Sequence, residues 1–156
     1  MPGETYKIVV GVDGSAASAA ALRFAVNEAR LRHSEVVAVL AWVPLSATRA
    51  PYARVTAMPS PTEEYEDAAE RLSHVVDDVC GLAPRVKVRQ VLIRQQPAQA
   101  LLNEAEGADL LVLGGHRADS PEIHTAGPVA RTCLRRQPCP IVIVAEDGEG
   151  HQATHP

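Results

Sequence analysis

Short apolar runs alternate with longer amphipathic segments along most of the chain. Five apolar runs have the length and composition of buried strands: Ile8–Val12, Val36–Trp42, Val86–Ile93, Asp109–Leu113 and Pro140–Val144. Four segments between them repeat apolar residues at helical spacing: from the Ser15 N-cap to about Arg32, about Pro61–Cys80, about Pro97–Glu106 and about Gly127–Arg136. Because strands buried on both faces are apolar throughout, this alternation predicts a parallel sheet with helices on both sides.

The predicted architecture is a single doubly wound α/β domain over residues 1–145, followed by a disordered polar tail over residues 146–156. Folds of this class bind ligands beyond the carboxyl ends of the strands, where the strand order reverses. Three segments are expected to meet at that place: Asp13–Ser15, Ala41–Pro44 and Gly114–Gly127.

The helix expected at about residues 61–80 follows a connection rich in Pro, Ala and Ser, residues 43–60. A connection of this length is usually a lid or disordered, and its composition favours disorder. The buried face of the helix is expected to contain the following residues: Tyr65, Ala68, Ala69, Leu72, Val75, Val76 and Val79.

Composition excludes several functional classes. The net charge is −4 and no basic stripe is present, which argues against nucleic-acid binding. No apolar run approaches the ~20 residues that a membrane-spanning helix needs, and residues 1–6 lack the pattern of a signal peptide. The three cysteines have no CxxC spacing, which favours a reduced, cytoplasmic protein without a structural metal site. No nucleophile elbow, HExxH or Walker loop is present.

The segment over residues 110–128 has the layout of a phosphate-binding loop, because an apolar strand leads into Gly114 and the fourth predicted helix starts near Gly127. Such a layout directs backbone N–H groups and the positive end of a helix at one point. Two residues oppose this interpretation. Arg117 stands where a glycine would ease the turn, and Pro128 lacks a backbone N–H.

Three stretches in this order and spacing resemble the universal stress protein family over about residues 5–145. They are Ile8-Val9-Val10-Gly11-Val12-Asp13-Gly14-Ser15, Gly107-Ala108-Asp109-Leu110-Leu111-Val112-Leu113-Gly114 and Gln137-Pro138-Cys139-Pro140-Ile141-Val142-Ile143-Val144. The resemblance implies the strand order 3-2-1-4-5 for the five strands. It also implies dimer formation through the last strand, Ile141–Val144, whose uncharged apolar edge independently favours pairing with another chain.

The nucleotide-binding branch of that family carries Gly-x2-Gly-x9-Gly-Ser/Thr after the fourth strand. On this chain the first and third glycines are Gly114 and Gly127, whereas the second falls on Arg117 and the hydroxyl residue on Pro128. The resemblance therefore implies the following cofactor-binding candidates: Asp13, Ala41, Gly114, Arg117, Gly127 and Val129.

Two interpretations of Asp13 stay open at this point: recognition of a ribose or adenine edge, or an Asx-turn that closes the strand–helix corner. Two main functions stay open as well, and an enzyme with an unrecognised site on the same scaffold is a third, weaker option. The favoured hypothesis is a dimeric regulatory module of the stress response with weak or absent ATP binding and no catalytic residues. The alternative is an ATP-binding sensor with slow hydrolysis, and Mg²⁺ is expected only together with ATP.

Overall fold

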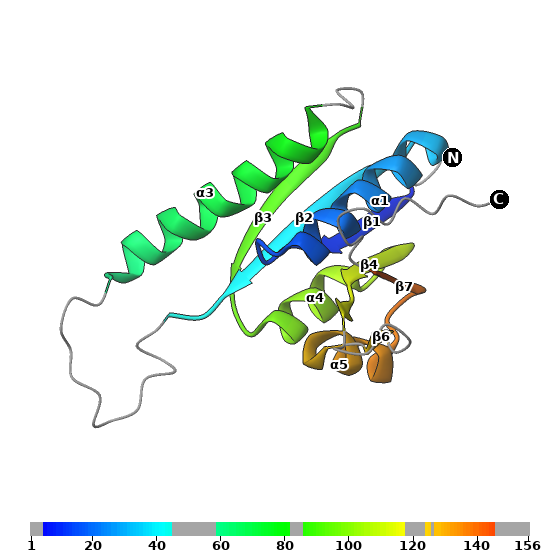
Figure 1. Ribbon diagram of the computed structural model, residues 1–156. Helices are drawn as coiled ribbons and strands as arrows, with labels where there is room; N and C mark the ends of the chain where they lie inside the picture. Colours follow the sequence, from blue (N-terminus) through cyan, green and yellow to red (C-terminus); the bar gives the residue numbers. More distant parts are fainter. Residues whose placement is uncertain (1–4, 45–58, 82–85, 118–123, 126, 146–156) are drawn as a thin grey trace.

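A five-stranded parallel sheet forms the centre of the molecule in the computed structural model, which describes residues 5–44, 59–81, 86–117, 124–125 and 127–145 (Figure 1). Its strands are β1 (Lys7–Gly11), β2 (Glu35–Trp42), β3 (Val88–Arg94), β4 (Leu110–Gly114) and β7 (Ile141–Val144). They lie in the order β3-β2-β1-β4-β7, and every neighbouring pair is parallel. The predicted α/β fold and the order 3-2-1-4-5 are thus confirmed.

Two pairs of helices enclose the sheet. They are α1 (Ala16–Arg32), α3 (Pro61–Cys80), α4 (Pro97–Ala105) and α5 (Pro128–Arg136). Alternate residues of each strand point to opposite faces, so Ile8 and Val10 pack with α1 and α3 whereas Val9 packs with α4 and α5. The result is a three-layer molecule with one apolar core on each side of the sheet.

The helix ends follow from local chemistry. The Ser15 hydroxyl accepts a hydrogen bond from the backbone N–H of Ser18 at 3.1 Å, so Ser15 caps α1 as predicted. At the start of α3, the Ser60 hydroxyl caps the N–H of Glu63 and Pro61 occupies the first turn. Beyond α4, Gly107 adopts φ +78°, a conformation that favours glycine.

One residue predicted for the core is on the surface. Ala68, Leu72, Val75, Val76 and Val79 of α3 are buried as expected, but the side chain of Tyr65 is 51% exposed. Tyr65 lies near the first turn of α3, at the carboxyl-terminal ends of β2 and β3, where it contacts Trp42 instead of entering the core. The helical spacing of apolar residues therefore continues past the region where the sheet can cover them.

The structure contains one small element that the sequence pattern did not predict. Strands β5 (His116–Arg117) and β6 (His124–Thr125) pair antiparallel beyond the end of β4.

The tail predicted over residues 146–156 and most of the connection over residues 43–60 lie outside the described residues. Among the helices that the structure describes, none is both long and apolar enough to cross a membrane.

Candidate functional site

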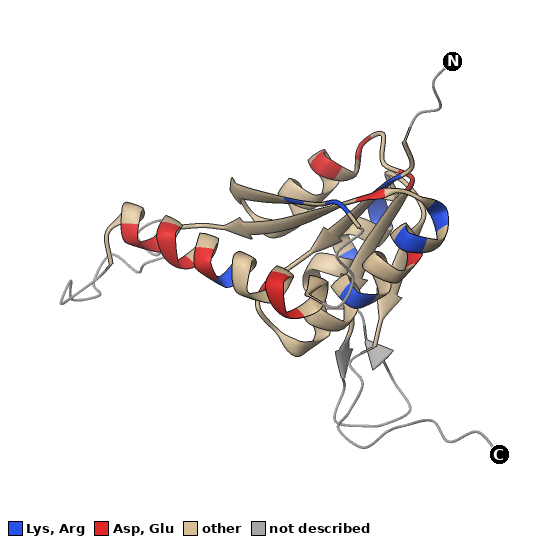
Figure 2. Ribbon diagram, turned by 90° about the horizontal axis from the view of Figure 1, so that it is seen from above, with Lys and Arg blue, Asp and Glu red and all other residues tan. Residues whose placement is uncertain are grey.

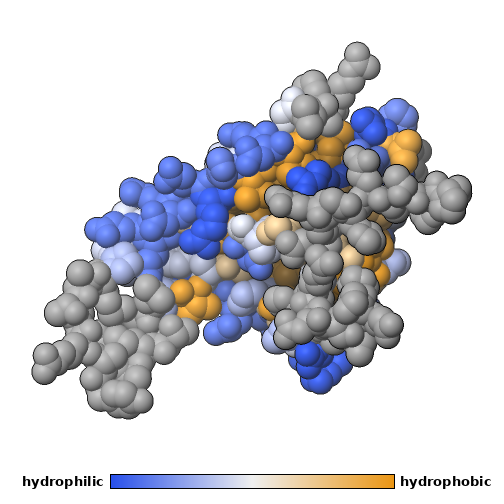
Figure 3. Space-filling model, viewed as in Figure 1, coloured by the Kyte–Doolittle hydropathy of each residue, from blue (hydrophilic) through white to orange (hydrophobic). Residues whose placement is uncertain are grey.

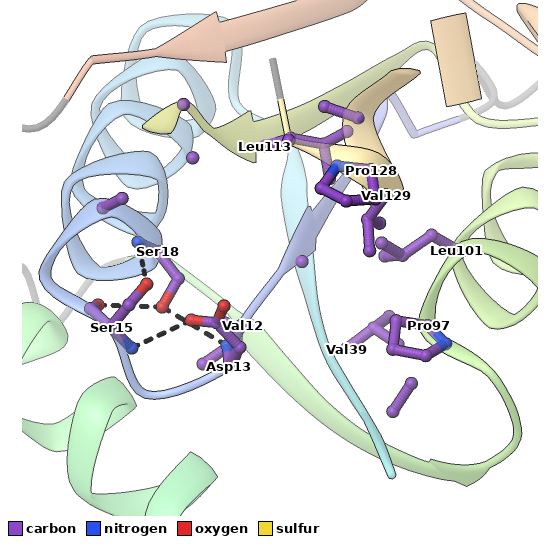
Figure 4. A pocket seen from close by; sticks show the side chains of 17 residues that line it. Val12, Asp13, Ser15, Ser18, Val39, Pro97, Leu101, Leu113, Pro128 and Val129 are labelled. Atoms are coloured by element: carbon purple, nitrogen blue, oxygen red, sulfur yellow. Dashed lines mark hydrogen bonds between the residues drawn. The ribbon is translucent and has the colours of Figure 1, made fainter. Parts of the chain in front are cut away.

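A pocket of about 250 Å³ opens at the carboxyl-terminal ends of β1, β2 and β4 (Figure 4). Between β1 and β4 the order of strands reverses, because β2 and β3 lie on one side of β1 and the strands later in the sequence lie on the other. This is the place where the fold class binds its ligands. The three segments expected to meet there all contribute lining residues: Asp13 and Ser15 from the first, Ala41 from the second, and Gly114, Gly115 and Gly127 from the third.

A compact hydrogen-bonded corner between β1 and α1 forms the polar wall of the pocket (Figure 4). The backbone N–H of Ser15 donates to Asp13 Oδ1 at 2.9 Å, which is the Asx-turn considered above. The Ser18 hydroxyl donates to the Ser15 carbonyl at 3.0 Å and accepts from the backbone N–H of Asp13 at 3.3 Å. Because these bonds fix the corner, the Asp13 carboxylate is held at the pocket that it lines.

The Asp13 carboxylate is ionised at neutral pH. Partial burial tends to raise its pKa, but hydrogen bonds from Ser15, from Ser18 and from its own backbone outweigh that effect and hold the pKa below the ordinary value of an aspartate. Asp13 is also the only charged side chain among the described residues that line the pocket. The charge of this site, as far as the structure describes it, is therefore negative.

Apolar side chains form the opposite wall. Val39 and Ala41 come from β2, Pro97 and Leu101 from α4, and Val129 from α5 (Figure 4). Val39 and Leu101 are buried, and they belong to the core on the α4 and α5 side of the sheet. A flat apolar group, such as a heterocyclic base, could therefore pack against this wall while a polar group reaches Asp13.

Packing against α1 explains why position 114 is a glycine, independently of any bound phosphate. A Cβ atom added there would lie 2.7 Å from the backbone carbon of Ala17 and 2.8 Å from its carbonyl oxygen. The end of β4 consequently packs directly against the first turn of α1. Next to it, the N–H of Gly115 donates to the Val144 carbonyl at 2.8 Å, which ties the pocket rim to β7.

The first turn of α5 points its amino-terminal end at the same pocket. Gly127 is the N-cap with no side-chain hydrogen bond, and Pro128 occupies the first helical position. Proline fits that position sterically, but it removes one of the four backbone N–H groups that a helix start can offer to an anion. Val129 and Ala130 keep their backbone N–H groups. The start of α5 can therefore still bind an anion, but with fewer N–H donors than a helix that begins without proline.

Five of the six predicted site residues line the pocket, namely Asp13, Ala41, Gly114, Gly127 and Val129. The backbone of Arg117 lies in β5, and its side chain is not described. Sequence reasoning missed Pro97 and Leu101, because α4 carries no motif and reaches the pocket only through the way it crosses the sheet. Within the described part of the chain, no group of three potential metal ligands occurs.

Comparison with known proteins identifies the family. The model of the universal stress protein family matches residues 5–145. Among curated proteins, the universal stress protein Rv2623 of Mycobacterium tuberculosis is 31% identical over 139 residues, which cover 89% of this chain and 45% of that protein. Rv1996 of the same organism is 34% identical over 140 residues, covering 87% and 43%. The chain thus spans less than half the length of these curated relatives.

Solved structures agree in fold along nearly the whole chain. A protein of the universal stress protein family from Burkholderia pseudomallei superposes with a TM-score of 0.65 at 26% identity, covering 92% of this chain and 98% of that one. A universal stress protein from Archaeoglobus fulgidus, solved in complex with dAMP, gives a TM-score of 0.62 at 25% identity and covers 89% and 97%. The sequence match and the shared fold lead to one conclusion: this chain belongs to the universal stress protein family.

Proposed function

We propose that this chain is a regulatory binding module whose pocket takes an adenine nucleoside or nucleoside monophosphate and takes ATP weakly. The observation that carries the proposal is the combination of an apolar wall with a single fixed carboxylate, Asp13, at the strand ends. An ionised carboxylate accepts hydrogen bonds from ribose hydroxyls, while the base packs on the apolar wall. The related protein solved with dAMP supports the choice of ligand class.

The size and charge of the pocket argue against tight binding of a triphosphate. Its volume of about 250 Å³ lies just below the usual range for ligand pockets, roughly 300–1,000 Å³. The described lining contains no cation, and the negative Asp13 would repel phosphate groups placed near it. Pro128 lowers the number of N–H donors at the start of α5. A single phosphate is therefore easier to accommodate than three.

Calorimetric titration of the purified chain tests this proposal. We expect AMP to bind with saturation and ATP with Mg²⁺ to bind no more tightly. The Asp13→Asn variant should bind AMP about tenfold more weakly, because it removes a charge-assisted hydrogen bond worth about 1.5 kcal/mol. Asparagine keeps an oxygen that can accept the Ser15 N–H, so the turn itself should survive the substitution.

Asp67→Asn is the matched control, because it removes a carboxylate from the exposed surface of α3, away from the pocket. Its AMP affinity should equal that of the unmodified protein. Absence of binding by AMP and adenosine at millimolar concentration would refute the proposed ligand class. Binding of ATP at least tenfold more tightly than AMP would support the ATP-sensor alternative instead, since the terminal phosphates would then contribute.

We also propose that the chain forms a homodimer through β7. This strand is an edge of the sheet, bonded to β4 on one side, and its residues Ile141–Val144 carry no charge (Figure 1). Its side chains are only partly buried on both faces. An uncharged apolar edge can continue the sheet into a second copy of the chain, whereas the opposite edge, β3, exposes Arg89 and Gln90.

Sedimentation equilibrium tests the dimer. We expect a dimer for the unmodified chain and a largely monomeric Val144→Lys variant, because a lysine at the end of the edge strand places like charges opposite each other in the paired sheet. Val88→Lys introduces the same charge at the other edge of the sheet, in β3, and should leave the dimer intact. If the unmodified chain is a monomer across the measured concentrations, the dimer proposal is wrong.

A further inference from the structure

A second depression lies on the other side of the sheet, at the carboxyl-terminal ends of β2 and β3. It has a volume of about 360 Å³, and we call its lining the aromatic groove: Trp42, Pro61, Thr62, Tyr65, Leu92 and Arg94. Trp42 and Leu92 pack with the core on the α1 and α3 side, whereas Ala41 of the nucleotide pocket belongs to the opposite side. The groove is therefore separate from the site described above.

The side chains of the groove are held in a defined arrangement. The rings of Trp42 and Tyr65 meet edge to face with centroids 6.3 Å apart. The Arg94 guanidinium lies over the Trp42 indole, 5.8 Å from the ring centroid. These contacts order the groove before any partner arrives, which reduces the conformational entropy lost on binding.

Tyr65 is unusually exposed for an aromatic residue. Tyr65 is 51% exposed. Among the described residues, Leu31 is the only other large hydrophobic residue that is exposed. Tyrosine, tryptophan and arginine are the side chains that most often dominate protein–protein contacts. The groove brings one of each together beside the partly buried Leu92. This composition is suited to holding an apolar side chain of another protein.

The charge around the groove defines the chemistry of that partner. The first two turns of α3 carry Glu63, Glu64, Glu66 and Asp67 and no basic residue. Figure 2 shows acidic positions along α3, and Figure 3 shows a hydrophilic surface over the same helix. Glu66 lies one turn beyond Thr62 and therefore on the side of α3 that borders the groove. Among the described residues that line the groove, Arg94 is the one cation, and its guanidinium already contacts the Trp42 ring.

We infer that the aromatic groove binds a basic segment of a partner protein, with an apolar side chain of that segment seated between Tyr65 and Leu92. Lysine or arginine residues on either side of the apolar side chain would then face the acidic start of α3. Complementary charge of this kind speeds encounter and selects against acidic partners. The inference does not depend on nucleotide binding, because the two sites use different faces of the sheet.

The chain offers a direct readout, because Trp42 is its only tryptophan. The probe is a short synthetic peptide with lysines around a central pair of leucines, titrated into the full chain while tryptophan emission is recorded. We expect a saturable change in emission that weakens as salt is added. Peptides with glutamate in place of lysine, or with alanine in place of leucine, should produce at most a weak response.

Two variants locate the binding. Tyr65→Ala should weaken the peptide affinity by about tenfold, as expected for a central aromatic contact. Glu66→Lys, a change on the exposed helix surface, should weaken it about threefold through charge alone. Leu31→Ala is the matched control, because Leu31 is 73% exposed on α1 and outside the groove. Thermal melting of each variant establishes that it is folded.

Several results would overturn the inference. One is an emission of Trp42 that does not change at millimolar peptide; another is an equal affinity in the Tyr65→Ala variant. Residues 45–58 lie outside the described part of the chain and contain Arg49 and Arg54 but no acidic residue. If exchanging both arginines for serine strengthens peptide binding tenfold, the chain itself competes for the groove, and the assignment to a partner protein is wrong.

Discussion

Replacing Gly114 by alanine should lower the free energy of unfolding by about 2 kcal/mol, within the usual range for overpacking a tight contact. The new Cβ would lie within 2.7–2.9 Å of three atoms of Ala17, two of which belong to the backbone of α1. A backbone cannot rotate away as a side chain can, so the helix start and the strand end must separate. For a chain of this size we expect the melting temperature to fall by roughly 4–8 °C.

Gly115→Ala is the matched control for this prediction. The added Cβ would meet the Cγ2 methyl group of Ile143 at 3.0 Å and otherwise backbone no closer than 3.5 Å. Because a side-chain methyl group can shift, this neighbouring substitution should cost less than half as much. Equal losses in the two variants, measured by urea unfolding, would show that Gly114 is not restrained by α1. The nucleotide loop would then be the better explanation of this glycine.

The sequence predicts most of the architecture because strands buried on both faces and amphipathic helices leave clear patterns. The start of α1 at Ser15 and that of α3 at Pro61 follow from capping chemistry that involves only adjacent residues. Tyr65 is the informative failure. Its helical spacing matches the buried stripe, but whether a sheet lies beneath that turn depends on the lengths of β2 and β3, which periodicity does not encode.

The residues of the candidate site, too, were predicted only in part. Asp13 and Gly114 are predictable because Asp13 follows β1 and Gly114 ends β4, and the carboxyl ends of parallel strands share one edge of the sheet. Pro97 and Leu101 were not predicted, since their role in the pocket arises from the tertiary position of α4. The reason for Gly114 also required coordinates: a motif comparison suggests a phosphate loop, whereas the contact with Ala17 explains the glycine without a ligand.

Truncation of Leu111 to alanine should cost about 3 kcal/mol of unfolding free energy, the largest loss expected here for a single substitution. Leu111 is fully buried in β4, next to Val9 of β1 and Ile141 of β7. Its side chain belongs to the core between the sheet and the α4–α5 layer. The strands fix the positions of its neighbours Val9, Val37 and Val39, which limits how far this core can collapse to fill the space. Urea unfolding should show a lower midpoint with an unchanged slope.

Leu113→Ala, two residues along the same face of β4, separates stability from binding. Leu113 is 5% exposed and lines the pocket at the strand ends, so its removal enlarges a space already open to water and leaves no sealed cavity. We expect it to cost clearly less stability than Leu111→Ala but to weaken AMP binding, because the apolar wall loses a contact. Folded Leu111→Ala protein should keep its AMP affinity. Equal losses of stability and of AMP affinity in both variants would contradict this prediction. The pocket and the sealed core beneath it would then form one unit. In that case the pocket would not be the preformed site that the proposed function requires.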